Sequence, residues 1–161
     1  MADSHSKFQK LANNVFLFRL YLLKSLPLAF IAGIKVKKLD HEHAITTVKY
    51  KWITQNPFRS MYFACMGMAA EMSTGLLIIN EIYQSSPPIS MLIISNQATY
   101  HKKAVGNITF TCSEGKNVSQ IITKAKQSQE AYVLDLKSVG KDESGEMVAE
   151  FIFSWSVKVK K

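Results

Sequence analysis

Asn56-Pro-Phe-Arg-Ser-Met-Tyr-Phe-Ala-Cys-Met-Gly-Met-Ala-Ala-Glu-Met-Ser-Thr-Gly75 is the stretch of sequence that decides the fold. Its Asn-Pro start is typical of a turn, and Ser60 is a residue type that often caps the first turn of a helix. The residues that follow, to about Tyr83, are mostly apolar or small, which predicts a long helix buried on all sides. We expect the rest of the chain to fold around this helix.

Glu71 is the only carboxylate between Met61 and Asn80. A buried carboxylate is costly unless it is paired, hydrogen-bonded or held in its protonated form. Groups with shifted pKa values gather at functional sites, although structural networks shift pKa values too. Glu71 is therefore expected either to act as a functional carboxylate or to be held structurally by Arg59 or Tyr62.

The composition indicates one domain of ordinary globular character. The 161 residues allow a substantial core, and a net charge of +8, from 20 basic and 12 acidic residues, favours polyanionic partners. The basic residues are scattered instead of forming an aromatic-interleaved patch, so the sequence argues against nucleic-acid binding. Cys65 and Cys112 lack metal-ligand spacing, so we expect buried thiols, no metal site and a cytoplasmic location.

The N-terminal segment, residues 1–30, is expected to be a helical extension. Apolar residues at helical spacing predict one helix over residues 7–24, and Pro27 is expected to end it. Lys10, Arg19 and Lys24 interrupt the apolar run, so it does not reach the length of a membrane span. Two readings stay open: the helix docks on the domain, or it lies on a membrane surface.

Residues 31–161 are expected to form a single α+β domain. Alternating apolar residues are typical of antiparallel strands with one buried face, and a short exposed helix is predicted over 118–127. Residues 89–102 start with an apolar run, which predicts burial on both faces of their first half. The strands are expected at 34–39, 44–53, 89–102, 108–112, 131–137 and 147–159, with a hairpin turn at 140–145. Their apolar faces need a cover, so we predict a curved sheet around the long helix.

This order of elements resembles the hotdog fold, in which a curved antiparallel sheet wraps a long central helix. The local motifs are similar to those of acyl-CoA thioesterases of the phenylacetate-degradation type. Asn56 stands at that family's loop Asn, Tyr62-Phe63 at its His-Gly pair and Glu71 at its helix acid. Residues 100–106 resemble its aromatic-x-x-Pro-Ala-x-x-Gly motif, with Lys103 in place of Pro. Among hotdog proteins, the match is nearest to an uncharacterised branch, and it covers roughly residues 30–159.

The resemblance implies thioester hydrolysis, with Glu71 as general base or nucleophile and Asn56 positioning water or the carbonyl. It places the Phe63 backbone N–H in the oxyanion role, with Ser60, Arg59 and Tyr62 lining the substrate site. Lys102, Lys103 and Arg59 are candidates to meet the phosphates of coenzyme A, which enters as part of the substrate and not as a cofactor. A homodimer or a dimer of dimers is implied. The alternative is a non-catalytic acyl-CoA or lipid-binding protein, because Tyr62 and Phe63 replace His and Gly.

Overall fold

The computed structural model describes residues 2–160, and the side chains of residues 7–160. Its helices are α1 (Ala2–Asn13), α2 (Val15–Ser25), α3 (Pro27–Ala32), η1 (Trp52–Thr54), α4 (Phe63–Ile82) and α5 (Gly115–Ser128). Its strands are β1 (Lys35–Leu39), β2 (Ala44–Lys49), β3 (Ile89–Tyr100), β4 (Asn107–Cys112), β5 (Tyr132–Lys141) and β6 (Met147–Val159).

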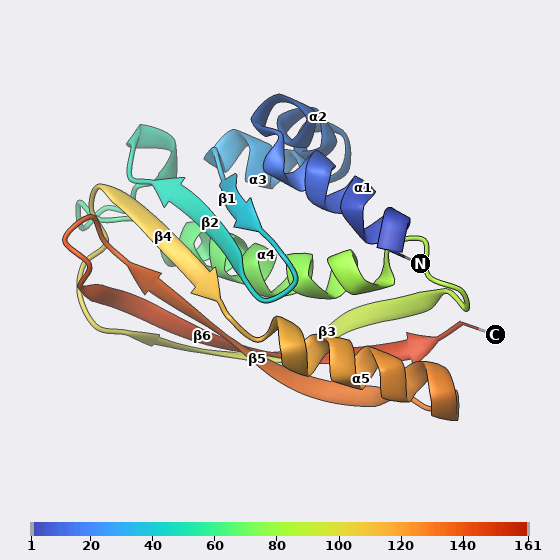
Figure 1. The fold of residues 1–161 in the computed structure, drawn as a ribbon. Coiled ribbons are helices and arrows are strands. Elements are labelled where there is room, and N and C mark those ends of the chain that lie inside the picture. The colour runs from blue at the N-terminus through green and yellow to red at the C-terminus, as the bar shows by residue number, and fades with distance from the viewer. Residues whose placement is uncertain (1, 161) are drawn as a thin grey trace.

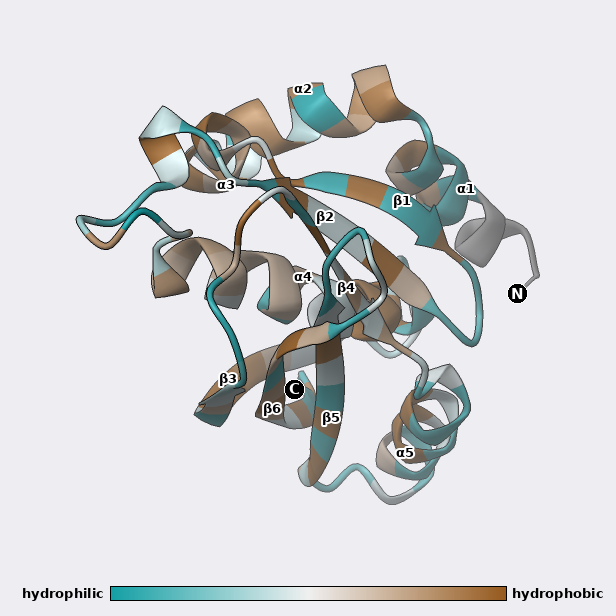
Figure 2. Ribbon diagram, turned by 90° about the vertical axis from the view of Figure 1, so that its left-hand side faces the viewer, coloured by the Kyte–Doolittle hydropathy of each residue, from teal (hydrophilic) through white to brown (hydrophobic). Residues whose placement is uncertain are grey.

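The six strands form one sheet in the order β1-β2-β4-β5-β6-β3. All of its pairings are antiparallel, and the sheet curves around α4 (Figure 1). The strands alternate in hydropathy along their length (Figure 2), as expected when one face covers a core and the other faces solvent. The α+β prediction and the hotdog architecture are confirmed.

The central helix, α4, is enclosed by the curved sheet, and α1 and α3 also pack against it, whereas α2 lies over β1 (Figure 2). By length and composition it could cross a membrane, but 67% of its most apolar window is buried inside the protein, as in a core helix. Hydrogen bonds join it to the sheet: Ser73 of α4 shares a 2.7 Å hydrogen bond with Ser138 of β5. Thr46 of β2 donates to the Ala69 carbonyl of α4 at 2.7 Å. These bonds fix the helix against the sheet at low cost, because few buried polar groups are left unpaired.

The N-terminal segment contains three helices where the sequence predicts one. Asn13 and Asn14 explain the first break: Asn13 exchanges two 2.8 Å hydrogen bonds with the backbone of Leu39 at the edge of β1. The Asn14 side chain accepts from Leu17 N at 3.0 Å and caps α2. The prediction that Pro27 ends the helix is also wrong in one respect, because Pro27 opens α3 at a position that needs no N–H donor.

Ser60 does not cap α4, contrary to the sequence prediction. The helix begins at Phe63, its N-cap is Tyr62, and no side chain makes a capping bond there. Ser60 is instead buried and hydrogen-bonded to Asn56. The strand predicted over 44–53 stops at Lys49, because the chain turns into η1, where the Thr54 hydroxyl bonds the backbone of Lys49 and Lys51.

The predicted burial of both faces of residues 89–94 is wrong. β3 is an edge strand that pairs only with β6, and its Leu92 and Ile94 side chains are 65% and 53% exposed. The hairpin turn predicted at 140–145 starts too early, because Gly140 lies inside β5 and not in a turn. A Cβ atom there would lie 2.4 Å from the Phe110 ring, so glycine is required by close approach and not by a bend.

Candidate functional site

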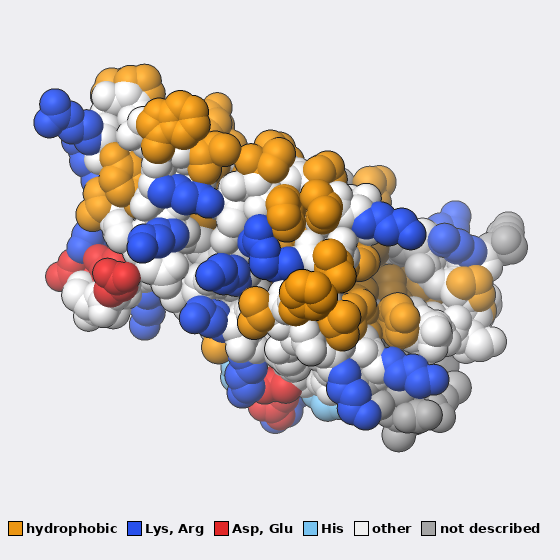
Figure 3. Space-filling view, turned by 90° about the horizontal axis from the view of Figure 1, so that it is seen from above, with side chains coloured by type: hydrophobic (Ala, Val, Ile, Leu, Met, Phe, Trp, Pro, Cys, Tyr) orange, Lys and Arg blue, Asp and Glu red, His pale blue; other side chains and the backbone are white. Residues whose placement is uncertain are grey.

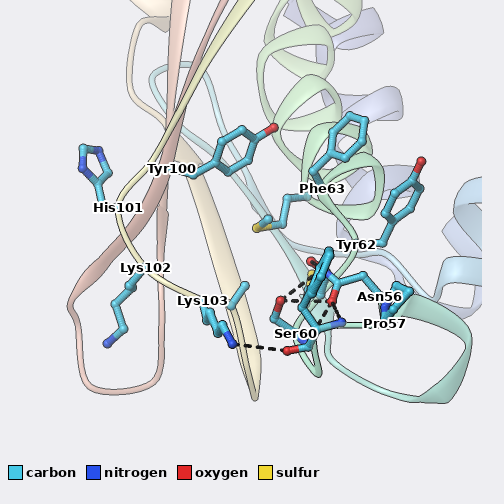
Figure 4. Close-up of a pocket in the computed structure, with 13 residues that line it drawn as sticks. Asn56, Pro57, Ser60, Tyr62, Phe63, Tyr100, His101, Lys102 and Lys103 are labelled. Carbon is cyan, nitrogen blue, oxygen red and sulfur yellow. Dashed lines mark hydrogen bonds between the residues drawn. The ribbon is translucent and has the colours of Figure 1, made fainter.

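A cleft of about 460 Å³ lies between the loop that precedes α4 and the segment that follows β3. The loop contributes Asn56, Ser60, Tyr62 and Phe63, and the other wall is formed by residues 100–104, as the labelled side chains in Figure 4 show. The sequence resemblance singled out both segments, which lie about 40 positions apart in the chain. The structure brings them together as two walls of one cleft.

Asn56 organises the loop through both ends of its side-chain amide. Its Oδ1 accepts from Phe58 N at 2.9 Å and from Ser60 N at 3.3 Å, and its Nδ2 donates to the Met61 carbonyl at 3.2 Å. The loop then closes through Arg59, which takes a left-handed conformation with φ 58°. Asn56 thus fixes the shape of the cleft wall, and its contact with a substrate stays a prediction.

The N-terminus of α4 opens beside the cleft at Phe63, which lines it. The first amides of a helix have no acceptor within the helix, and they carry the positive end of the helix dipole. The Tyr62 and Phe63 rings pack edge to face, with centroids 4.9 Å apart, and both remain about half exposed. The arrangement can receive a developing negative charge, and the two rings offer an apolar rim for a ligand.

The two lysines on the opposite wall differ in their partners. Lys102 Nζ lies 2.7 Å from Asp142 Oδ2 and also contacts the Glu146 carboxylate, and both ion pairs raise the pKa of Lys102. Lys103 Nζ donates to the Phe58 carbonyl at 3.3 Å, across the cleft (Figure 4), and has no carboxylate partner among the described side chains. The charge of Lys102 is already balanced by carboxylates, so Lys103 is the better placed of the two to meet an anion.

Glu71 lies in a different place, beside a second cavity of about 250 Å³. The cavity is mostly apolar and is lined by Met68, Glu71 and Met72 of α4 and by residues 25–29, which link α2 to α3. Burial alone raises the pKa of the Glu71 carboxyl to about 6. Among the described residues no side chain pairs with it, so the predicted structural role through Arg59 or Tyr62 finds no contact to support it.

Gly75 and Trp155 lie beside Glu71, and only the contact with Trp155 was missed by the sequence reasoning. A Cβ atom at Gly75 would lie 3.3 Å from Glu71 Oε1 and 3.4 Å from the Trp155 ring, so the absence of a side chain at Gly75 leaves room for both groups. Trp155 is held by a 3.1 Å hydrogen bond from its Nε1 to Thr74 Oγ1. The alternation of β6 marked Trp155 as buried, but no pattern within one strand could show that it meets α4 beside the acid.

Within one copy of the chain, the Glu71 cavity and the cleft are separate. Phe63 and Glu71 lie eight positions apart on α4, which is about 12 Å along the helix axis. Glu71 does not line the cleft, and Asn56 and Phe63 do not line the cavity. In the described part of the chain, no three His, Cys, Asp or Glu side chains gather as a metal site would require.

Comparison with known proteins places the chain among others of this shape. It resembles PA5026 of Pseudomonas aeruginosa, a probable thioesterase, with a TM-score of 0.76 and 18% identity, covering 89% of this chain and 95% of that one. Thioesterase HI1161 of Haemophilus influenzae is similar with a TM-score of 0.65 and 10% identity, covering 91% of each chain. The protein OLEI01261 of Chlorobaculum tepidum, of unknown function, has a TM-score of 0.76 and 10% identity, covering 97% and 94%. No curated protein matches the chain.

Identities this low show a shared fold and leave the activity open. The sequence itself carries a clearer signal, because the family model described as "Domain of unknown function (DUF4442)" matches residues 16–157, which is most of the chain. The match spans α2 to β6 and so includes both the cleft and the Glu71 cavity. The chain therefore belongs to the DUF4442 family, and it has the hotdog fold that it shares with the thioesterases of similar structure.

Proposed function

We propose that the protein is an acyl-CoA thioesterase in which the Glu71 carboxylate acts on the thioester. One observation carries the proposal: Glu71 is a carboxylate in an apolar cavity, no side chain of residues 7–160 pairs with it, and its pKa is raised to about 6. A general base works best when its pKa lies near the pH at which it operates. A purely structural carboxylate would be expected to have a partner, since an unpaired buried charge is destabilising.

Two chemical routes fit a carboxylate at this position. In the first, Glu71 takes a proton from water as the water oxygen attacks the thioester carbonyl; the C–S bond then breaks and the thiolate takes up the proton. In the second, a Glu71 oxygen attacks the carbonyl, the thiolate leaves, and water hydrolyses the resulting anhydride. A single turnover in ¹⁸O-labelled water separates the routes, because only the anhydride route can leave label on Glu71.

The cleft supplies the remaining requirements of thioester hydrolysis. The Phe63 N–H at the start of α4 is a donor for the developing oxyanion. Lys103, which lines the cleft, and Arg59, which lies in the loop between the lining residues Phe58 and Ser60, are candidates to meet coenzyme A phosphates. Lys102 is engaged with Asp142 and Glu146. No resident cofactor is invoked, since coenzyme A is part of the substrate.

A homodimer would bring the two regions together, and it forms part of the proposal. The support is the distance of about 12 Å between Phe63 and Glu71 along α4, which is too long for one thioester carbonyl to touch both. β3 is a 12-residue edge strand with exposed Leu92 and Ile94, and such edges pair readily with another strand. We propose pairing through β3, so that Glu71 of one copy meets the cleft of the other, as a dimer or a dimer of dimers.

The first test is an assay of short-, medium- and long-chain and aromatic acyl-CoAs with the unaltered protein and Glu71→Gln. Loss of a general base typically lowers the rate about 100- to 10,000-fold, so we expect turnover with one acyl class and its near-complete loss in Glu71→Gln. Asp135→Asn, an exposed carboxylate on β5 that bonds Ser154, is the matched control and should keep full activity. Equal activity of Glu71→Gln and the unaltered protein would refute the proposal.

A second outcome would favour the alternative function. The half-exposed Tyr62 and Phe63 rings at the cleft rim favour a protein that binds acyl-CoA or lipid without hydrolysing it. Saturable binding of an acyl-CoA that is unchanged in Glu71→Gln, with no turnover of any member of the panel, would support that reading.

A further inference from the structure

The N-terminal helices carry apolar residues on both sides, and only one side is used by the fold. Phe18 and Leu22 of α2 are buried against the domain. The opposite side carries an outer apolar face, which we define as Phe16, Leu17, Leu20 and Leu23 of α2 with Leu28 and Ile31 of α3; each is 45–71% exposed. Phe16, Leu20 and Leu23 follow the spacing of one helical stripe. Figure 2 shows α2 as brown, hydrophobic turns interrupted by a hydrophilic stretch.

This outer apolar face is held in place by specific contacts. Asn14 caps α2, and the neighbouring Asn13 is bonded to the edge of β1. The Arg19 guanidinium of α2 lies 4.2 Å from the centre of the Phe30 ring of α3. The face is therefore presented by a fixed scaffold, so the exposure of its side chains is not a consequence of loose packing.

The charge around the face is mostly positive, although Leu28 of the face shares a cavity with Glu71. Residues 7–39 contain seven Lys or Arg and no Asp or Glu. Figure 3 shows the molecule from this side: hydrophobic side chains lie among Lys and Arg, and the carboxylates in view lie at the margins. Basic side chains around an apolar helical face are the features that bind interfacial helices to anionic lipid.

We propose that the outer apolar face docks on the surface of an anionic lipid bilayer, with α2 lying in the plane of the headgroups. Two copies of the chain meeting on this face would bring their basic residues together, which is unfavourable. An anionic bilayer, in contrast, accepts both the apolar side chains and the positive charge. The argument for docking does not rest on the proposed hydrolase activity, although Leu28 of the face also lines the Glu71 cavity.

The experiment measures binding of the full chain to vesicles, by co-sedimentation with phosphatidylglycerol–phosphatidylcholine vesicles and with pure phosphatidylcholine. We expect binding to the anionic vesicles only, weakening as salt is raised from about 0.05 to 0.5 M because added ions screen the attraction. The triple variant Phe16→Ser/Leu20→Ser/Leu23→Ser should lower the partition coefficient at least about tenfold. The double variant Lys24→Gln/Lys37→Gln should lower the partition coefficient less, and the binding that remains should depend less on salt.

The control variants carry the same kinds of substitution on other surfaces. Val133→Ser/Ile152→Ser alters exposed apolar residues of β5 and β6, and Lys124→Gln/Lys158→Gln removes two charges elsewhere; both should bind as the unaltered chain does. Circular dichroism and thermal melting of each variant identify any that fails to fold, and the charge variants then carry the test. Absence of vesicle binding, or equal loss in the controls, would overturn the proposal. So would a triple variant that splits a dimer, because the face would then be an interface between copies.

Discussion

The cleft beside Asn56 and the cavity beside Glu71 lie at different places along the same helix, and they are built in opposite ways. In the cleft, the Asn56 amide is bonded to its own loop at both ends. In the cavity, the Glu71 carboxyl has an apolar lining and a pKa raised by burial alone. The contrast separates two uses of polar groups: Asn56 stabilises a shape, whereas Glu71 is kept at a cost in stability, as functional groups often are.

The largest expected effect concerns the N–H at the start of α4. Phe63→Pro removes this donor at the helix position that best tolerates proline, and Tyr62 already has the extended conformation required before proline. Relative to Phe63→Ala, which keeps the N–H, we expect a fall in kcat of about 100- to 1000-fold. Steady-state kinetics with the preferred acyl-CoA measures it.

The same variant tests whether one site is shared between two copies. If Glu71 and the cleft act across a dimer, mixing Phe63→Pro with Glu71→Gln restores one intact site in each mixed dimer, about a quarter of normal activity after random exchange. No recovery after confirmed exchange of subunits would contradict the shared site and leave the hydrolase activity itself untouched.

Asn56→Ala should damage stability more than any other single change in the cleft. It removes the acceptor for two backbone amides and leaves buried Ser60 without its side-chain partner. At about 1 kcal/mol for each bond, we expect a loss of about 2–3 kcal/mol in the free energy of unfolding. Urea denaturation measures it, and Asn56→Asp, which keeps the acceptor, should lose less.

Glu71→Gln should change how stability depends on pH. The carboxyl holds its proton to about pH 6 in the folded state and to about 4.5 when unfolded. Folding therefore becomes less favourable as pH rises from 4.5 to 6, by about 2 kcal/mol in total at 1.36 kcal/mol per pKa unit. Glutamine does not titrate, so Glu71→Gln should lack this loss. Its unfolding free energy should therefore rise relative to that of the unaltered protein between pH 4.5 and 6, and the difference should then level off. A difference that stays constant from pH 4 to 7 would show that the carboxyl is not desolvated.

Arg59→Gly is expected to have the smallest effect, and it should be stabilising. Arg59 has φ 58°, a conformation that costs a side chain about 1 kcal/mol more than glycine. The gain is partly offset by the greater freedom of glycine in the unfolded chain, so a rise in melting temperature of a few degrees is expected. If Arg59 also meets coenzyme A, the same variant should weaken its binding. An unchanged or lower melting temperature would show that the side chain itself holds the loop.

The fold was predictable because its main signals are long and repetitive. The apolar run of α4 and the alternation of Met147–Val159 each extend over a dozen or more residues, so single exceptions do not alter the interpretation. The wrong predictions concern residues whose role depends on their neighbours in space. The apolar start of β3 predicts burial, but whether a strand lies at the edge or in the centre of a sheet depends on strand order, which one strand does not encode. Gly140 and Pro27 have more than one structural use, and their neighbours in space select between them.

The candidate site was predictable as a set of residues but not as an arrangement. Spacing alone relates Asn56, Phe63 and Glu71, and all three lie on the loop and helix where the resemblance puts them. The sequence gives no sign that Glu71 faces residues 25–29 while the other two face the cleft, because that depends on how the α2–α3 link crosses over α4. The partners of Lys102 were equally hidden, since they lie 40 and 44 positions away.

The enclosure of α4 also determines how readily its backbone amide hydrogens exchange with solvent. The helix is covered by the sheet and by α1 and α3, and most of its residues are buried. Amide hydrogens in the middle of α4 should therefore exchange for deuterium only when the whole molecule unfolds, whereas those at its ends exchange through smaller openings. A ligand that covers the Phe63 end would slow exchange there first. Hydrogen–deuterium exchange of α4, followed by mass spectrometry, would thus report both the global stability of the protein and ligand binding in one experiment.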